Sequence, residues 1–183
     1  MSVTGPDCFA DQRGFSLPEV LLAAFVTTVG FAALATAMQI GGYGVQEGIQ
    51  LSTATFLSEQ KLEQAKNLPW ISTPANDCLG ISASPTAAPT VPTGQACTNG
   101  PTTISAGGAI TWLADESSTA IPGFSGYSRT VRITDCGSGA GCAGITDPGM
   151  RLVIATVSYT PMTGVGVAVT AKSVQVQMVV SKR

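Results

Sequence analysis

The sequence predicts an α+β protein in which one long N-terminal helix precedes a head built on an antiparallel β-sheet. Two observations predict the helix: residues 20–46 carry no charged side chain, and residues 51–68 then place apolar side chains at helical spacing. A third observation predicts the sheet, because segments 127–134 and 172–180 alternate apolar and polar residues, as half-buried strands do. The chain is expected to consist of three successive regions, 1–14, 15–68 and 69–183.

The composition narrows the class of protein. The chain has 183 residues, enough for one ordinary domain with its own core, and only 11% of them are charged. Nine Lys and Arg residues are spread thinly and form no basic stripe, so we expect no nucleic-acid partner. Histidine, the commonest general base and metal ligand, is absent from the sequence, so we expect no enzymatic activity, no metal and no cofactor.

The first region, residues 1–14, is a short polar leader that ends in Gly14. It differs from a secretory signal peptide, whose cleavage site follows the apolar core rather than preceding it. The 26 residues from Phe15 to Ile40 would extend about 39 Å as a helix, enough to cross a bilayer. Pro18 is compatible with the first turn, because its missing N–H would have no partner there.

A carboxylate, Glu19, stands at the beginning of this apolar run. Placing an ionised carboxylate in hydrocarbon costs roughly 2.5–3.5 kcal/mol on insertion scales. The sequence therefore predicts a partner for the charge of Glu19. The alternative is an ordinary signal anchor whose glutamate lies at the level of the lipid headgroups.

The helix is expected to change character near Gly41, Gly42 and Gly44, each of which costs up to about 1 kcal/mol relative to alanine. The half 15–42 is expected to span the membrane and the half 43–68 to be amphipathic, with Pro69 ending the helix. The face expected to pack against the head consists of Leu51, Ala54, Ser58, Leu62, Ala65 and Leu68.

Five cysteines divide unevenly about the apolar run, with Cys8 before it and four after it. An even set on one side of a membrane suggests two disulfides in an oxidising compartment. Three pairings are possible, and short sequence separation favours Cys78–Cys97 and Cys136–Cys142. Free thiols are one alternative and a zinc site is another, but neither CxxC spacing nor histidine accompanies these cysteines to favour zinc.

The head is expected to be β-rich. Segment 151–160 is apolar on both faces, as a central strand would be, and the short connection 160–166 implies an antiparallel partner. The Pro/Thr/Ser-rich segment 81–95 is expected to be an irregular surface loop, whose glycosylation the sequence leaves open. The expected strands are 108–114, 127–134, 151–160 and 172–180.

Several conspicuous side chains of the head are expected to be structural. Trp70 and Trp112 are expected in the core rather than in a ligand platform. Asp115 and Glu116 are expected in a solvated turn rather than as a paired acid and base. The arginines of the expected strands, Arg129, Arg132 and Arg151, are expected to be solvated or paired.

The start of the helix resembles the processing motif of type IV prepilins. In that family a short leader ends in glycine, an aromatic or apolar residue and a small polar residue follow, and glutamate is the fifth mature residue before a long apolar helix. The positions that fit this motif are Gly14, Phe15, Ser16, Leu17 and Glu19. The order of leader, helix, loop and antiparallel sheet is also similar, so the resemblance implies the type IV pilin fold.

Three features depart from the family pattern. Pro18 occupies a position where most members carry an aliphatic residue. The leader contains Asp7 and Asp11 with only Arg13 to set topology, which is a thin positive-inside signal. A proline that many major pilins carry deeper in the helix is absent, and Gly41–Gly44 could supply flexibility instead.

The resemblance implies a partner for Glu19. A prepilin peptidase, a membrane aspartic protease, would cut between Gly14 and Phe15 and methylate the new amino group of Phe15. Glu19 of one subunit would then meet the Phe15 ammonium of a neighbour. At about 4 Å and an effective dielectric near 20 the attraction is about 4 kcal/mol, similar to the insertion cost. Glu19 would thus set the register between subunits and would have no catalytic role.

The resemblance also implies a subclass, because segment 56–70 and the final two strands look like PilV-like minor pilins. Such a subunit would be a single-pass protein of the bacterial inner membrane with a periplasmic head, held by lipid before assembly. It would join other major and minor pilins through the inner-membrane assembly platform and would aid assembly initiation near the tip, or adhesion. Two alternatives remain open: a type II secretion pseudopilin, and a bitopic membrane protein with a periplasmic binding domain.

Overall fold

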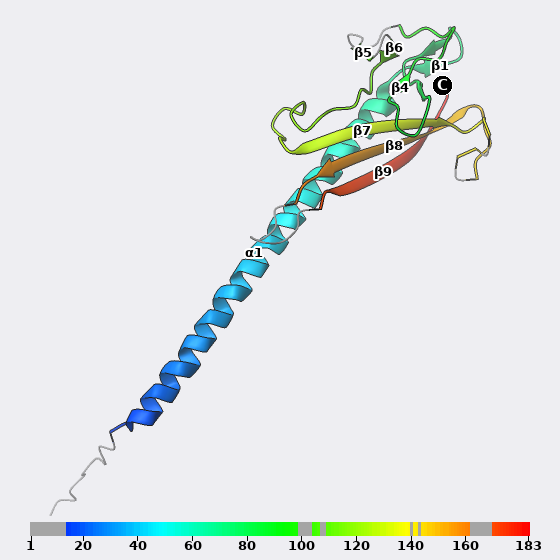
Figure 1. Ribbon diagram of the computed structural model, residues 1–183. Helices are drawn as coiled ribbons and strands as arrows, with labels where there is room; N and C mark the ends of the chain where they lie inside the picture. The colour runs from blue at the N-terminus through cyan, green and yellow to red at the C-terminus, as the bar shows by residue number, and fades with distance from the viewer. Residues whose placement is uncertain (1–13, 99–103, 107–108, 140, 143, 162–169) are drawn as a thin grey trace, which may run out of the picture. The chain divides into compact units, whose positions relative to one another are not determined.

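The computed structural model describes residues 14–98, 104–106, 109–139, 141–142, 144–161 and 170–183 (Figure 1). The chain divides into two compact units, the first ending at Gly42 and the second beginning at Tyr43. The elements are one long helix and several strands, so the α+β class predicted from the sequence is confirmed.

Helix α1 spans Leu17–Asn67, 51 residues, and agrees with the predicted range to within two residues at either end. The C=O of Ser16 accepts hydrogen bonds from the N–H groups of Glu19 (2.9 Å) and Val20 (3.2 Å), which places Ser16 at the N-terminal boundary. The glycines at 41, 42 and 44 do not interrupt the helix, since a cooperative helix of this length tolerates a local cost of a few kcal/mol. The boundary between the two units nevertheless falls beside them.

The first unit, in its described part 14–42, is helical from Leu17 onward and exposes every side chain. The exposed residues include large apolar ones all round the helix, among them Phe25, Phe31 and Leu34. By length and composition α1 could cross a membrane. An all-round apolar surface of this kind needs lipid or other helices around it.

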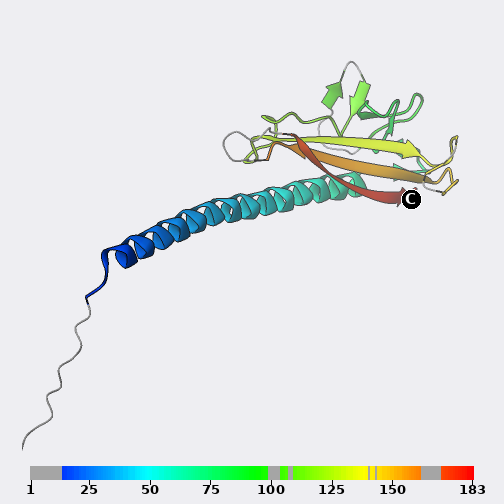
Figure 2. The ribbon, with the colours of Figure 1, turned by 60° about the horizontal axis from the view of Figure 1, so that its bottom comes forward.

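The second unit contains a three-stranded antiparallel sheet in the order β7-β8-β9 (Figure 2). Strand β7 spans Tyr127–Asp135, β8 spans Met150–Tyr159 and β9 spans Lys172–Ser181. β8 is central, as its two apolar faces predict. The predicted turn 160–166 lies largely outside the described residues, but the strands on either side of it are antiparallel neighbours.

One face of this sheet packs against the second half of α1. The buried sheet residues include Val131, Ile133, Val153 and Val157, and the β9 residues at 174, 176, 178 and 180 are half-buried on the same face. The buried helix residues are Ala54, Leu57, Ser58, Lys61, Leu62 and Ala65.

The predicted helix face is therefore wrong in two respects. Leu51, expected to be buried, is 50% exposed, whereas Leu57 and Lys61 are buried. The buried positions 54, 57, 58, 61, 62 and 65 form a stripe at three- and four-residue steps, and Leu51 lies one step before the first of them.

Three small hairpins surround the main sheet. The first pairs β1 (Trp70–Ile71) with β2 (Asn76–Asp77), the second β3 (Ile81–Ser82) with β4 (Pro89–Thr90), and the third β5 (Ile104–Ala106) with β6 (Ala109–Thr111). Strand β6 lies within the predicted segment 108–114, but it pairs with β5, which the sequence did not predict.

The prediction that 81–95 is an irregular loop is wrong in part, because β3 and β4 fall within it. Gly80 makes this pairing possible: its φ is +73°, and a Cβ there would lie 2.7 Å from the Thr90 carbonyl oxygen. Pro89, counted in the sequence as a loop residue, is fully buried. Gly80 and the Cys78–Cys97 disulfide thus stabilise strand pairing in segment 81–95, whose composition alone indicates a loop.

Candidate functional site

The predicted cleavage site lies immediately before α1. Gly14, Phe15 and Ser16 precede the helix, and the Phe15 side chain is 80% exposed. A protease can reach a peptide bond in an exposed, non-helical segment more easily than one inside a helix. The structure therefore leaves the Gly14–Phe15 bond accessible, two residues ahead of the helical hydrogen-bond ladder.

Glu19 lies in the first turn of α1, where its charge is favourable against the helix dipole. Its side chain is exposed, and no cation among the described residues pairs with it. The dipole supplies only about 0.3–1 kcal/mol at an exposed position, which is less than the cost of placing the carboxylate in hydrocarbon. Glu19 thus lacks an ionic partner within its own described chain.

Both predicted disulfides are present, Cys78–Cys97 and Cys136–Cys142. The pairing follows sequence proximity, as expected, and the zinc alternative is excluded because the four sulfur atoms are bonded in pairs. Cys8 lies outside the described residues. The disulfides give the second unit two covalent staples suited to an oxidising compartment.

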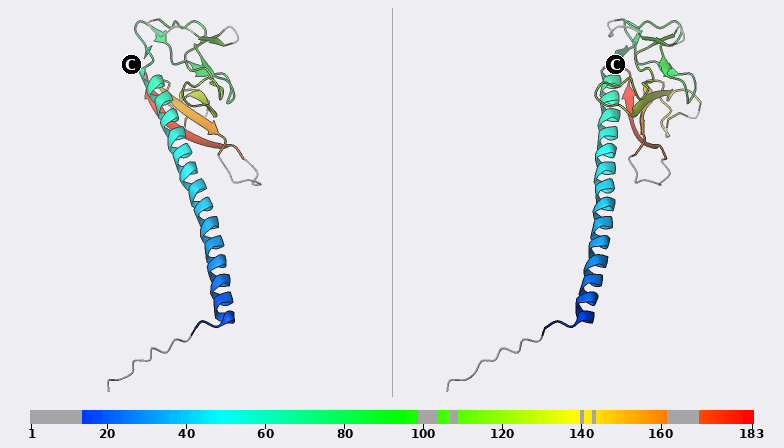
Figure 3. Two further views of the ribbon diagram at one scale, coloured as in Figure 1. Left: turned by 90° about the vertical axis from the view of Figure 1, so that its left-hand side faces the viewer. Right: turned by 60° about the vertical axis from the view of Figure 1, so that its left-hand side comes forward.

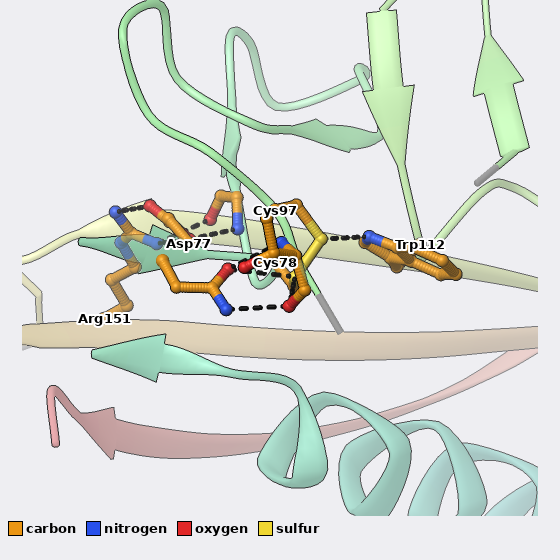
Figure 4. Close-up of a disulfide and its surroundings, with 8 residues drawn as sticks. Asp77, Cys78, Cys97, Trp112 and Arg151 are labelled. Carbon is orange, nitrogen blue, oxygen red and sulfur yellow. Dashed lines mark hydrogen bonds and ion pairs between the residues drawn. A yellow bond between two sulfur atoms is a disulfide. The ribbon is translucent and has the colours of Figure 1, made fainter. Parts of the chain in front are cut away.

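The Cys78–Cys97 bridge lies in a partly buried polar network (Figure 4). Trp112, itself buried, donates its Nε1–H to the Cys97 sulfur at 2.7 Å. The side-chain amide of Asn76 donates to the Thr98 carbonyl at 2.7 Å and accepts from the Thr98 N–H at 3.0 Å. These contacts hold the chain on both sides of the bridge, and the buried position of Trp112 agrees with its predicted core role.

Next to this bridge, Arg151 of β8 and Asp77 form a buried bidentate ion pair (Figure 4). The two nitrogen–oxygen distances are 2.8 and 2.7 Å, and the side chains are only 7% and 4% exposed. Asp77 also accepts the Gly80 N–H at 2.9 Å, and the guanidinium carbon lies 4.2 Å from the centre of the Trp70 ring. The Nε of Arg151 is buried without a partner among the described atoms, so this pair holds the fold and offers no reactive group.

A second ion cluster joins α1 to β7 and corrects a prediction. Glu116 accepts hydrogen bonds from Lys61 (2.7 Å) and Arg129 (2.5 Å), and Arg129 also donates to Gln60 at 2.6 Å. Glu116 therefore does not belong to a solvated turn. Partial burial raises the pKa of Glu116, but hydrogen bonds and charge from Arg129 and Lys61 outweigh it and hold that pKa below its ordinary value of 4.5.

Asp115, the other member of that expected turn, pairs with Arg132 on the opposite face of the sheet. The pair is bidentate, at 2.6 and 2.9 Å, and Arg132 also donates to the carbonyls of Pro85 (3.2 Å) and Thr86 (2.9 Å). A groove of about 620 Å³ lies beside it, lined largely by hydroxyl side chains with Ile154 among them. Asp115 and Glu116 thus face different partners and form no acid–base pair.

No group of three or more His, Cys, Asp or Glu side chains among the described residues could hold a metal ion. Compared with models of known protein families, with curated proteins and with solved structures, the chain matches none of them. A function can therefore be argued from three features of the chain: the segment Gly14–Glu19, the apolar half of α1 and the head with its two disulfides.

Proposed function

We propose that this chain is a type IV pilin-like subunit, made as a membrane-anchored precursor, cut between Gly14 and Phe15, and assembled into a filament through the apolar half of α1. The observation that carries the proposal is the segment Gly14–Glu19: a glycine before the cut, an aromatic residue after it, and a glutamate in the first turn of an apolar helix. Under this proposal the chain is a peptidase substrate and not an enzyme.

The surroundings of Glu19 support the role in assembly. The carboxylate has no cationic partner among the described residues, and it heads a helix whose first half is apolar on all sides. Cleavage would create an ammonium group at Phe15, near the positive end of the helix dipole, where it would repel that dipole. Pairing the Glu19 carboxylate of one subunit with the Phe15 ammonium of the next would neutralise both charges and fix the spacing of the subunits.

The second unit supports an extracytoplasmic head. Its two disulfides require an oxidising compartment, which for a bacterial inner-membrane precursor is the periplasm. A helix that continues into an antiparallel sheet, with apolar residues between them, is also the arrangement that the type IV pilin fold would have. Within this class we propose a minor pilin that acts in assembly initiation or adhesion; a type II secretion pseudopilin would share every feature named so far.

Intact-mass analysis of the protein from cells with a prepilin peptidase tests the proposal. We expect a mature chain that begins at N-methylated Phe15. The matched control is Gly14→Val, whose β-branched side chain in place of glycine should block cleavage and leave the chain intact at Met1. A wild-type chain that keeps residues 1–14 would overturn the proposal and favour a bitopic membrane protein with a periplasmic binding domain.

A further inference from the structure

Strand β9 hydrogen-bonds to β8 through every second residue. Just beyond the strand, the N–H of Lys182 donates to the Gly149 carbonyl at 2.8 Å, which continues the register that pairs Met150 with Ser181. Because bonded and non-bonded pairs alternate in an antiparallel ladder, the even-numbered residues of β9 direct their backbone groups toward β8. The residues whose backbone groups point away are Ser173, Gln175, Gln177, Val179 and Ser181.

In the part of the chain that the structure describes, this outer edge of β9 is open. Within the described chain, none of these five residues has a backbone partner on that side. The edge closes only after the strand, where the Arg183 N–H donates to the Trp70 carbonyl (3.0 Å) and the Arg183 carbonyl accepts from Ser72 (3.1 Å). From Ser173 to Ser181 the open length is about 27 Å.

The other edge of the sheet, on β7, is occupied. Glu116 and Arg129 exchange two backbone hydrogen bonds of 2.9 Å, and the Ser82 hydroxyl accepts the Ile133 N–H at 3.0 Å. A strand from outside can therefore extend the sheet at β9, whereas side chains and backbone of this chain already occupy the β7 edge at Arg129 and Ile133.

Strand β9 lacks the features that commonly protect an exposed edge from pairing. Between Lys172 and Lys182 it has no charged residue and no proline, and its ten-residue register contains no bulge. The four β9 side chains that face α1 are only half-buried. The side chains on the opposite face of the strand are exposed Ser, Gln and Val residues. An added strand with apolar residues on the helix side would cover this half-buried row.

A groove of about 320 Å³ borders the C-terminal part of this edge. Its walls come from Glu63 and Lys66 of α1, from residues 178–181 of β9, and from Arg183. The side chains of an added strand that point toward α1 would enter this groove beside Met178 and Val180. The site thus combines a backbone ladder with a pocket for alternate side chains, as in strand-addition recognition.

The direction of β9 argues against a second copy of this chain as the partner. Glu47 pairs with Lys172 at one end, and the Lys66 carbonyl accepts from Arg183 at the other (3.0 Å), so β9 and the second half of α1 run the same way (Figure 3). Antiparallel pairing of β9 with β9 would direct the second halves of the two α1 helices oppositely, which is incompatible with two copies anchored in one membrane, a step that rests on the proposed function. Parallel pairing through the same edge would set the odd-numbered residues of one copy, mostly Ser and Gln, beside the half-buried apolar row of the other.

We therefore propose that the open edge of β9 binds an extended segment of a different protein by strand addition. The segment carries apolar side chains at every second position and no charge along the stretch that faces Ser173–Ser181. Main-chain hydrogen bonds supply much of the affinity, and the groove beside Met178 selects the side chains.

A phage-displayed library of random decapeptides, selected on the purified full-length protein in detergent, tests this site. We expect the selected peptides to alternate apolar and neutral polar residues. A bound peptide should protect the amide protons of the five outward-pointing residues from exchange with solvent. A selection that yields no alternating peptide, or protection elsewhere, overturns the proposal.

Two variants separate backbone pairing from side-chain contact. Gln177→Pro removes one outward N–H without touching the ladder to β8, and should weaken peptide binding about tenfold. Gln177→Ala keeps that N–H and should bind within about twofold of the wild type. Gln175→Pro provides a second position if Gln177→Pro unfolds, as judged by thermal melting and intact disulfides.

Equal binding by a folded proline variant and by the wild type would overturn the proposal. A sedimenting dimer that Gln177→Pro dissociates would also overturn it, because the edge would then belong to a second copy. Neither result depends on the state of the N-terminus. Failure of cleavage at Gly14 and failure of the β9 site are therefore distinguishable.

Discussion

Breaking the buried Arg151–Asp77 pair should be among the most destabilising single changes in the head. Asp77→Ala leaves the Arg151 guanidinium charged, 7% exposed and over the Trp70 ring, and also frees the Gly80 N–H. Removing one partner of a buried pair costs about 3–5 kcal/mol, because the remaining charge stays desolvated. For a domain of this size the loss corresponds to a fall in melting temperature on the order of 10–20 °C.

The chain contains a matched control in Asp115→Ala. Asp115 and Arg132 form the same bidentate contact, but their side chains are 45% and 17% exposed. An ion pair with this exposure contributes about 0–1 kcal/mol. Asp115→Ala should therefore lower the melting temperature by no more than about 4 °C.

Near-ultraviolet circular dichroism at pH 7 without reductant reports the unfolding, since both tryptophans are buried in the head. The double variant Asp77→Ala/Arg151→Met should recover much of the loss, because it removes the unpaired charge as well. If Asp77→Ala and Asp115→Ala were equally destabilising, or if the double variant were less stable than Asp77→Ala, the reasoning from burial would be wrong.

Three further predictions concern assembly, disulfides and pH. Glu19→Val should leave cleavage intact but reduce incorporation into filaments, measured by immunoblot of sheared fibres, since about 4 kcal/mol of pairing is lost; normal incorporation would remove the proposed role of Glu19. Replacing Cys78 and Cys97 by alanine should cost about 3 kcal/mol, and replacing Cys136 and Cys142 about 2, because the first pair closes the longer loop; the reverse order in denaturant titrations would contradict this. Glu116→Gln should destabilise the head most above pH 4.5, and the difference should shrink as the pH falls through the lowered pKa of Glu116. An effect independent of pH between 3 and 7, in melting curves, would count against the ion cluster.

Periodic patterns in the sequence were sufficient to predict the main elements. The apolar run and the stripe at 54–65 determine α1, and the two-residue alternation of Val174–Val180 predicts which face of β9 lies toward the helix. Sequence proximity was enough for both disulfides. Each of these signals is local, so a single chain can reveal it without a structure.

The ion pairs depend on long-range contacts and could not be predicted in the same way. Asp77 and Arg151 are 74 positions apart in the sequence. Lys61 meets Glu116 only because the helix packs beside the point where Glu116 pairs with Arg129 of β7. Lys61 did leave a signal, since it occupies a position of the buried helical stripe. The hairpin at 81–90 was not predicted, and only the second strand of the hairpin at 104–111 was. The composition of segment 81–95 suggests a loop, and the positive φ of Gly80, which lets β3 and β4 pair, is not visible in the sequence.

The most direct test of the account is the distance between two groups in an assembled fibre, measured by electron cryomicroscopy at near-atomic resolution. A fibre containing this subunit should place the Glu19 carboxylate within about 4 Å of the amino group of Phe15 or of the equivalent first residue in an adjoining subunit. A fibre in which the Glu19 carboxylate is hydrated, or is bonded only within its own chain, would contradict the account.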